Sequence, residues 1–171
     1  LAVWLVGSEK GWVGDRTFSR VLRDYLVGGS SAVRAFDTES PRGTLTRFYP
    51  GMTEIVDLDR TGNQMQIFDT LEEDDVKVSL VDARAWQLRT ILTALREISF
   101  FDAVREERFD LLLFHILSSS VAYLEEIAEM APVVRDAQYF LVKNHVGEGT
   151  HIEWDPKICR AYFDRAKNTT E

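Results

Sequence analysis

Residues 1–28 read LAVWLVGSEKGWVGDRTFSRVLRDYLVG and contain three consecutive patterns. Leu1–Val6 is a short apolar run, typical of a buried strand. The loop Gly7–Gly14 contains three glycines. In Phe18–Leu26, apolar residues recur at helical spacing, and Thr17 is the predicted N-cap. A strand, a glycine loop and an amphipathic helix in this order predict the start of an α/β sheet whose first loop has the context of a phosphate-binding loop.

The rest of the chain continues to alternate strand and helix patterns. Apolar runs predict further strands at Ala32–Phe36, Thr53–Leu58, Val76–Val81, Phe109–Leu117 and Ala137–Val142. Apolar periodicity predicts helices at Gln64–Leu71, Ala85–Ile98, Val121–Ala128 and Pro156–Lys167. This alternation predicts one α/β domain over residues 1–171, with a mostly parallel sheet flanked by helices. Ligands of such sheets bind at the carboxyl ends of the strands.

Composition excludes several classes of protein. A chain with 45% hydrophobic and 28% charged residues is not disordered as a whole. The formal net charge of −8 argues against general binding to DNA, although a local basic patch remains open. Cys159 is the only cysteine, which excludes an intramolecular disulfide and a cysteine-based zinc cluster. This cysteine usage favours a reducing, cytoplasmic location. Since no apolar run reaches about 18 residues, we expect no membrane helix. The sequence lacks an initial Met, and we expect the natural chain to start before Leu1.

The loop Gly7–Thr17 carries the clearest motif. Glycines allow backbone N–H groups to surround phosphate oxygens, and the following helix N-terminus adds partial positive charge. Lys10-Gly11, Gly14 and Thr17 match the loop KGGxGK[ST][ST], so the chain resembles the ParA/MinD family of P-loop ATPases. The resemblance implies a P-loop NTPase-like fold and a nucleotide site formed by Lys10, Gly11, Trp12, Val13, Gly14, Asp15, Arg16, Thr17 and Asn144. In that family, the lysine that corresponds to Lys10 contacts phosphate across a dimer interface.

Three positions of this loop depart from the family pattern. Trp12 replaces a glycine, Asp15 replaces the main phosphate-binding lysine, and Arg16 replaces the Mg²⁺-binding hydroxyl. A carboxylate about 4 Å from a phosphate charge costs about 4 kcal/mol at an effective dielectric near 20. The Arg16 guanidinium is a candidate compensating cation, but it cannot replace a hydroxyl on Mg²⁺. These departures predict loss of ATP hydrolysis.

Three further positions extend the resemblance, and each has a simpler interpretation. Asp37, in the stretch Asp37–Gly43, is similar to the family residue that positions the attacking water, or it begins an acidic turn. Asp82 resembles the family's Mg²⁺-side aspartate, or it caps the next helix; the Pro and Gly of the neighbouring switch are absent. Asn144 follows a strand where the family has an adenine reader, or it is a turn residue.

Other candidate sites are weaker. His145, His151 and Glu153 are near enough in sequence to ligate a metal, but their spacing matches no strong pattern, and a surface loop is the alternative. His115 is predicted to be a hydrogen-bonded core histidine. The stretch Ser118–Ser120 is predicted to be a helix cap and not a nucleophile. The remaining assignments are an inert thiol for Cys159, a solvated basic face for the helix at 156–167 and a partner or base contact for Trp12.

Three functional hypotheses follow. The chain binds ATP or ADP with Mg²⁺, as a homodimer, and acts as a switch in positioning DNA or a protein complex. Alternatively, it is a pseudo-ATPase that needs no cofactor and serves as a scaffold for a protein partner. The third hypothesis is an active ATPase that uses Lys10 and Arg16 in place of the missing lysine. A related kinase or amide-ligase fold is a weaker alternative, because those enzymes also need that lysine.

Overall fold

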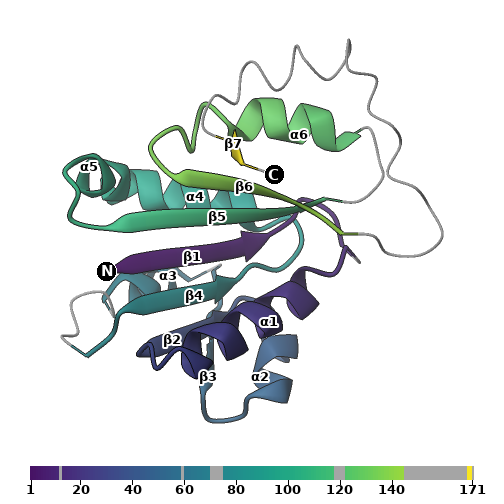
Figure 1. The fold of residues 1–171 in the computed structure, drawn as a ribbon, viewed down its shortest axis with the longest axis vertical. Coiled ribbons are helices and arrows are strands. Elements are labelled where there is room, and N and C mark those ends of the chain that lie inside the picture. Colours follow the sequence, from purple (N-terminus) through teal and green to yellow (C-terminus); the bar gives the residue numbers. More distant parts are fainter. Residues whose placement is uncertain (12, 59, 70–74, 118–121, 145–168, 171) are drawn as a thin grey trace.

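The computed structural model describes residues 1–11, 13–58, 60–69, 75–117, 122–144 and 169–170. These residues form a parallel sheet with the strand order β3-β2-β4-β1-β5-β6-β7 (Figure 1). The strands are β1 (Ala2–Gly7), β2 (Val33–Asp37), β3 (Thr53–Ile55), β4 (Val78–Asp82), β5 (Asp110–Leu117), β6 (Gln138–Lys143) and β7 (Thr169–Thr170). The prediction of a mostly parallel α/β sheet is confirmed.

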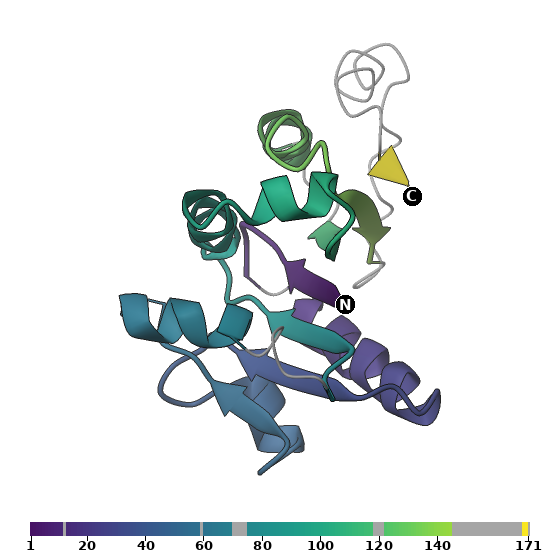
Figure 2. The ribbon, with the colours of Figure 1, turned by 90° about the vertical axis from the view of Figure 1, so that its left-hand side faces the viewer.

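Helices cover both faces of this sheet. They are α1 (Asp15–Gly28), α2 (Thr44–Phe48), α3 (Thr61–Asp69), α4 (Leu88–Glu97), α5 (Phe100–Arg105) and α6 (Ala122–Met130). Figure 2 shows α1 and α2 on one side of the sheet and α3, α4 and α6 on the other. Coverage on both sides explains why the central strands read as continuous apolar runs: every residue of β4 is buried.

The predicted strands lie within three residues of the observed ones at each end. The predicted Thr17 cap is wrong: α1 begins at Asp15 and its N-cap is Gly14, so Thr17 lies within the first turn. The helices α2 and α5 were not predicted, because five or six residues are too few to show helical periodicity. The predicted helix at 156–167 lies outside the described residues.

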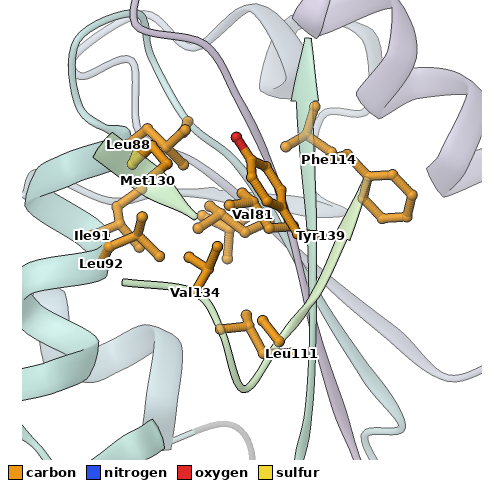
Figure 3. Packing of buried hydrophobic residues seen from close by; sticks show 14 of the residues in the cluster. Val81, Leu88, Ile91, Leu92, Leu111, Phe114, Met130, Val134 and Tyr139 are labelled. Atoms are coloured by element: carbon orange, nitrogen blue, oxygen red, sulfur yellow. The ribbon is translucent and has the colours of Figure 1, made fainter. Parts of the chain in front are cut away.

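The larger part of the core joins β1, β4 and β5 to α4 and α6. Leu88, Ile91 and Leu92 of α4 face Met130 at the end of α6 (Figure 3). Val134, Leu111 and Tyr139 continue the same cluster toward β5 and β6. This packing fixes α4 and α6 beside each other on one face of the sheet.

The connections reverse direction beside β1. β1 lies between β4 and β5, and the chain leaves β1 toward β2 but leaves β4 toward β5. The helices α1 and α4 therefore begin next to each other and run over opposite faces. Such a topological switch point is where ligands of α/β sheets bind. The described site residues that were predicted in the loops after β1, β2 and β4 lie at this edge.

Candidate functional site

The loop between β1 and α1 has the backbone of a glycine turn into a helix. Gly14 lies in the left-handed region at φ 88° and ψ 13°, and its carbonyl accepts the first helical hydrogen bond from Phe18 N–H at 3.0 Å. The loop lies against the segment that follows β4, where Trp86 N–H donates to the Ser8 carbonyl at 3.3 Å. A Cβ on Gly7 would lie 3.0 Å from the Ala83 Cβ. The β4–α4 segment therefore forms one wall of this loop.

Asp15 is the residue that the sequence resemblance aligns with a phosphate-binding lysine. Its side chain is buried, with 3% exposed, at the first residue of α1. Burial raises its pKa, and the neighbouring Glu39 carboxylate adds to the rise, while hydrogen bonds and charge from Arg16 oppose it. The group at this position is thus a buried acid with the wrong sign for a phosphate.

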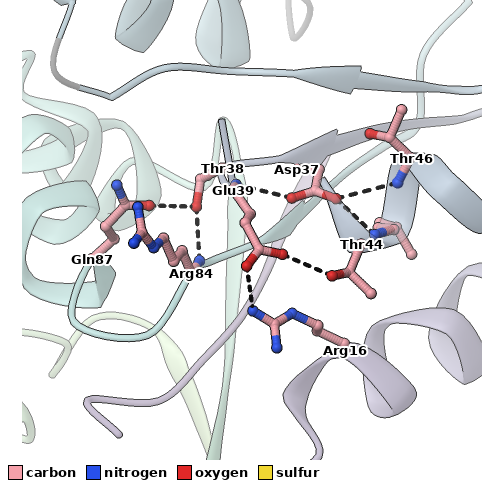
Figure 4. Close-up of polar contacts among 9 residues, drawn as sticks. Arg16, Asp37, Thr38, Glu39, Thr44, Thr46, Arg84 and Gln87 are labelled. Atoms are coloured by element: carbon pink, nitrogen blue, oxygen red, sulfur yellow. Dashed lines mark hydrogen bonds and ion pairs between the residues drawn. The ribbon is translucent and has the colours of Figure 1, made fainter. Parts of the chain in front are cut away.

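Arg16 is already neutralised within the chain. Its guanidinium lies 2.7 Å from Glu39 Oε1, and the Thr44 hydroxyl donates to Glu39 Oε2 at 2.7 Å (Figure 4). Both ion-pair side chains are about one third exposed. The compensating cation that the sequence offered is therefore held by the β2–α2 loop.

Asp37, at the end of β2, is enclosed by backbone donors. Leu45 and Thr46, in the first turn of α2, donate N–H bonds to Asp37 Oδ2 at 2.7 and 3.2 Å. Glu39 N–H donates to Oδ1 at 2.9 Å (Figure 4). A Cβ on Gly43 would overlap this carboxylate, so only glycine fits there. The geometry matches the turn interpretation and adds a cap on α2; the catalytic role of Asp37 stays a prediction.

Asp82 lies directly beside Asp37, since the two are register partners on parallel strands. Its Oδ1 accepts a hydrogen bond from the Ser19 hydroxyl of α1 at 2.7 Å. Burial, with the charges of Asp37 and Asp15, raises the pKa of Asp82 to about 8 against the favourable Ser19 bond. The alternative that Asp82 caps the next helix is wrong, because the N-cap of α4 is Gln87.

The loops after β2 and β4 are joined by one threonine. The Thr38 hydroxyl donates to Gln87 Oε1 at 2.7 Å and accepts from Arg84 N–H at 2.7 Å (Figure 4). Thr38 N–H also donates to the Asp82 carbonyl at 3.1 Å. The family's switch glycine is absent here, and the segment that replaces it is tied to β2 by these bonds.

Lys10 is held at the opposite wall of the loop, against α6. Its ammonium lies 3.8 Å from Glu126 Oε1 and 4.8 Å from the centre of the Tyr123 ring. Glu126 Oε2 in turn lies 3.5 Å from Nε2 of the fully buried His115. Glu9, beside Lys10, is also buried, which raises its pKa. Sequence patterns do not indicate Glu9 and Glu126, because their ion pairs depend on how α4 and α6 pack beside the loop.

Asn144 and His115 have defined partners. The Asn144 amide donates to the Val13 carbonyl at 2.6 Å, which ties the end of β6 to the phosphate loop. Its role as a base reader stays a prediction. The core interpretation of His115 is confirmed, since Nδ1 lies 2.7 Å from the Tyr139 hydroxyl. The predictions for Trp12, Ser118–Ser120, His145, His151, Glu153 and Cys159 concern positions outside the described residues.

The side chains of this site do not fit a Mg²⁺-bound triphosphate. Asp15, Asp37 and Asp82 bring three buried acids to one strand edge, and Lys10 and Arg16, the cations of residues 7–17, have acidic partners. In the described part of the chain, no group of three or more His, Cys, Asp or Glu side chains is arranged to hold a metal ion. The loop therefore has the glycine-turn backbone of a phosphate site, but it lacks the positive charge that binds phosphate.

Comparison with known proteins supports the fold. No protein-family model and no curated protein sequence matches the chain. The structure is similar to that of a nucleotide-binding protein from Archaeoglobus fulgidus, solved in complex with ADP and with Co. The TM-score is 0.56 at 14% identity, over 95% of this chain and 76% of the other. At this identity the likeness shows the P-loop-like α/β fold alone.

Proposed function

We propose that this chain is a ParA/MinD-like protein that has lost ATP hydrolysis and serves as an interaction scaffold, in the positioning of DNA or of a protein complex. The observation that carries the proposal is the buried Asp15 carboxyl at the position of the phosphate-binding lysine. Arg16 stands where the family has a Mg²⁺-binding hydroxyl and is paired with Glu39. Both changes remove functions that hydrolysis needs.

The charge balance supports this proposal. A phosphate oxygen about 4 Å from an ionised Asp15 meets about 4 kcal/mol of repulsion at an effective dielectric near 20. Recruiting Arg16 as a counter-charge requires breaking its bond to Glu39. Recruiting Lys10 requires taking it from Glu126. Each rearrangement subtracts from the binding free energy of a nucleotide.

Binding of a nucleotide without hydrolysis is a second candidate. The left-handed Gly14 at the start of α1 and the similarity to a structure that contains ADP both favour it. Because the pKa of Asp82 is raised to about 8, this acid becomes neutral as the pH falls below 8. Nucleotide binding of this kind tightens from pH 8 to pH 6, which separates it from ordinary Mg²⁺-dependent binding.

Calorimetric titration with ATP and ADP, with and without Mg²⁺, tests the proposal. We expect no Mg²⁺-dependent heat from the unchanged chain and a gain of Mg²⁺-dependent binding in the double variant Asp15→Lys/Arg16→Thr. The matched control is Asp69→Lys/Arg47→Thr, which makes the same charge change at exposed positions. Mg²⁺-dependent binding with ATP turnover by the unchanged chain would reject the loss of hydrolysis.

The proposed partner is another protein. The net charge of −8 disfavours DNA as a general partner. Homodimerisation through the loop edge is part of the proposal, and sedimentation velocity across a concentration series tests it. We place the protein in the cytoplasm; among the described helices, none combines the length and apolarity that crossing a membrane requires.

A further inference from the structure

A groove lies on the α4–α6 face of the sheet, and it meets the Gly7–Gly14 loop only at one end, through the ion pair of Arg89 with Glu9. It consists of two cavities of about 380 and 190 Å³ that share Arg96 and Val133 in their linings. One wall is α4, another is α5, and the third is the end of α6 with the turn that leads to β6 (Figure 1). We call this feature the α4–α6 groove.

The floor of the α4–α6 groove is apolar and packed. Leu92 and Met130, each 2% exposed, belong to the main core and line the smaller cavity. Phe101 and Pro132 line the larger one, and Val133 lies in both. Such a floor can accept apolar side chains but offers nothing to a chain of phosphates.

The rim is rich in arginine. Arg89 and Arg96 lie on the groove side of α4, with Arg105 from α5 and Arg135 from the turn. Four arginines line the groove against three acids, Asp102, Glu129 and Asp136, so the groove is net positive in a chain of net charge −8. Arginine is also the charged side chain enriched at protein interfaces.

The pairing within this rim singles out one arginine. Arg89 pairs with Glu129 and, at 3.6 Å, with Glu9 of the loop after β1. Arg105 pairs with Asp102 and, at 3.2 Å, with Asp136. Among the described residues, the Arg96 side chain has no ion-pair or hydrogen-bond partner. Arg96 lies where the two cavities meet, so the centre of the groove holds a cation without an acid.

We propose that the α4–α6 groove binds an acidic, amphipathic segment of a partner protein. A carboxylate of that segment pairs with Arg96, and a neighbouring apolar side chain packs over Val133 and Pro132. Arg89 and Arg96 are two turns apart on α4, about 10 Å, so the contact spans about two turns of a bound helix. The apolar side chains of the floor offer no partner to a chain of phosphates, which favours a protein segment over nucleic acid. The proposal is independent of nucleotide binding.

Fluorescence anisotropy with the full chain tests this groove. The probe is a labelled peptide of about 14 residues with Glu and Leu at helical spacing, compared with a Lys/Leu peptide and a single-stranded DNA of equal length. We expect the Glu/Leu peptide alone to bind, and Arg96→Glu to weaken its binding roughly tenfold or more. The matched control is Arg47→Glu on α2, an exposed arginine on the other face of the sheet, with a change below about twofold.

Three results would overturn the proposal. They are no binding of the Glu/Leu peptide by the unchanged chain, equal losses in Arg96→Glu and Arg47→Glu, and tighter binding of the DNA than of the peptide. Circular dichroism checks that each variant is folded. If Arg96→Glu is not folded, Arg96→Ala replaces it, with an expected loss of roughly fivefold; a loss no larger than that of Arg47→Ala then rejects the groove.

Discussion

The carboxyl ends of β2 and β4 place two aspartates side by side in different surroundings. Asp37 and Asp82 are register partners and are almost equally buried, with 1% and 3% exposed. Asp37 accepts three backbone N–H bonds from its own loop and from α2. For Asp82 the structure shows one bond, from the Ser19 hydroxyl.

This contrast shows that hydrogen-bond donors, together with burial, determine the ionisation of a buried carboxyl group. Burial raises the pKa of both groups, and backbone amides oppose the rise at Asp37. At Asp82 the pKa reaches about 8, so this carboxyl is mostly protonated at neutral pH. Asp37 is therefore held by hydrogen bonds within its own loop and α2, whereas Asp82 is a mostly neutral acid with one hydroxyl donor.

The largest change in unfolding free energy is expected when a side chain is added at Gly43, next to Asp37. In the Gly43→Ala variant, the new Cβ overlaps the Asp37 carboxylate, which must turn away and leave the α2 amides without an acceptor. We expect a loss of roughly 3 kcal/mol of unfolding free energy, measured by urea denaturation. The matched control is Gly28→Ala at the exposed end of α1, where nothing lies within 4 Å. Equal effects of the two substitutions would show that Gly43 is not held by Asp37.

The second largest effect is expected from replacing each aspartate with asparagine, which distinguishes the two sites by their stability. Asp37→Asn places an NH₂ group against backbone donors and loses about 2 kcal/mol of unfolding free energy at pH 8. Asp82→Asn mimics the protonated acid and still offers an oxygen to Ser19, so it does not destabilise the fold at pH 8. Equilibrium unfolding of both variants checks the opposite outcomes, and an equal loss would remove the distinction between the two sites.

The pH dependence of stability gives this pair a second measurement. The pKa of Asp82 is higher in the folded state than in the unfolded state. Between these two pKa values, the folded state binds a proton that the unfolded state has lost. Its contribution to stability is complete below about pH 4 and is lost as the pH rises toward 8. We expect the unfolding free energy of Asp82→Asn to fall less steeply than that of the parent over this range, by up to about 1.4 kcal/mol per pH unit. Parallel curves would contradict a raised pKa.

Features that depend on one short segment of the chain were predictable, whereas contacts between distant segments were not. The six longer strands were predictable because each is a buried apolar run within one segment of the chain. Asp37, Asp82 and Arg16 were found as site residues because they follow strands or lie in the glycine loop. Their partners Ser19, Glu39 and Leu45 come from α1, the β2–α2 loop and α2, and the sequence does not show which of these will meet. The start of α1 at Asp15 was missed because the cap is a left-handed glycine and not a hydroxyl.

The smallest effect we expect concerns Ser19, the buried residue whose hydroxyl donates to Asp82. This bond lowers the pKa of Asp82, so it favours the charged form. In Ser19→Ala the pKa of Asp82 therefore rises further above 8, while the unfolding free energy falls by about 1 kcal/mol, partly offset by the better helix propensity of alanine. Titration of the Asp82 carboxyl carbon by NMR measures the shift, with the exposed Thr17→Ala on the same helix as the control. An unchanged or lowered pKa would mean that the burial of Asp82, and not the balance between burial and its donor, sets its ionisation.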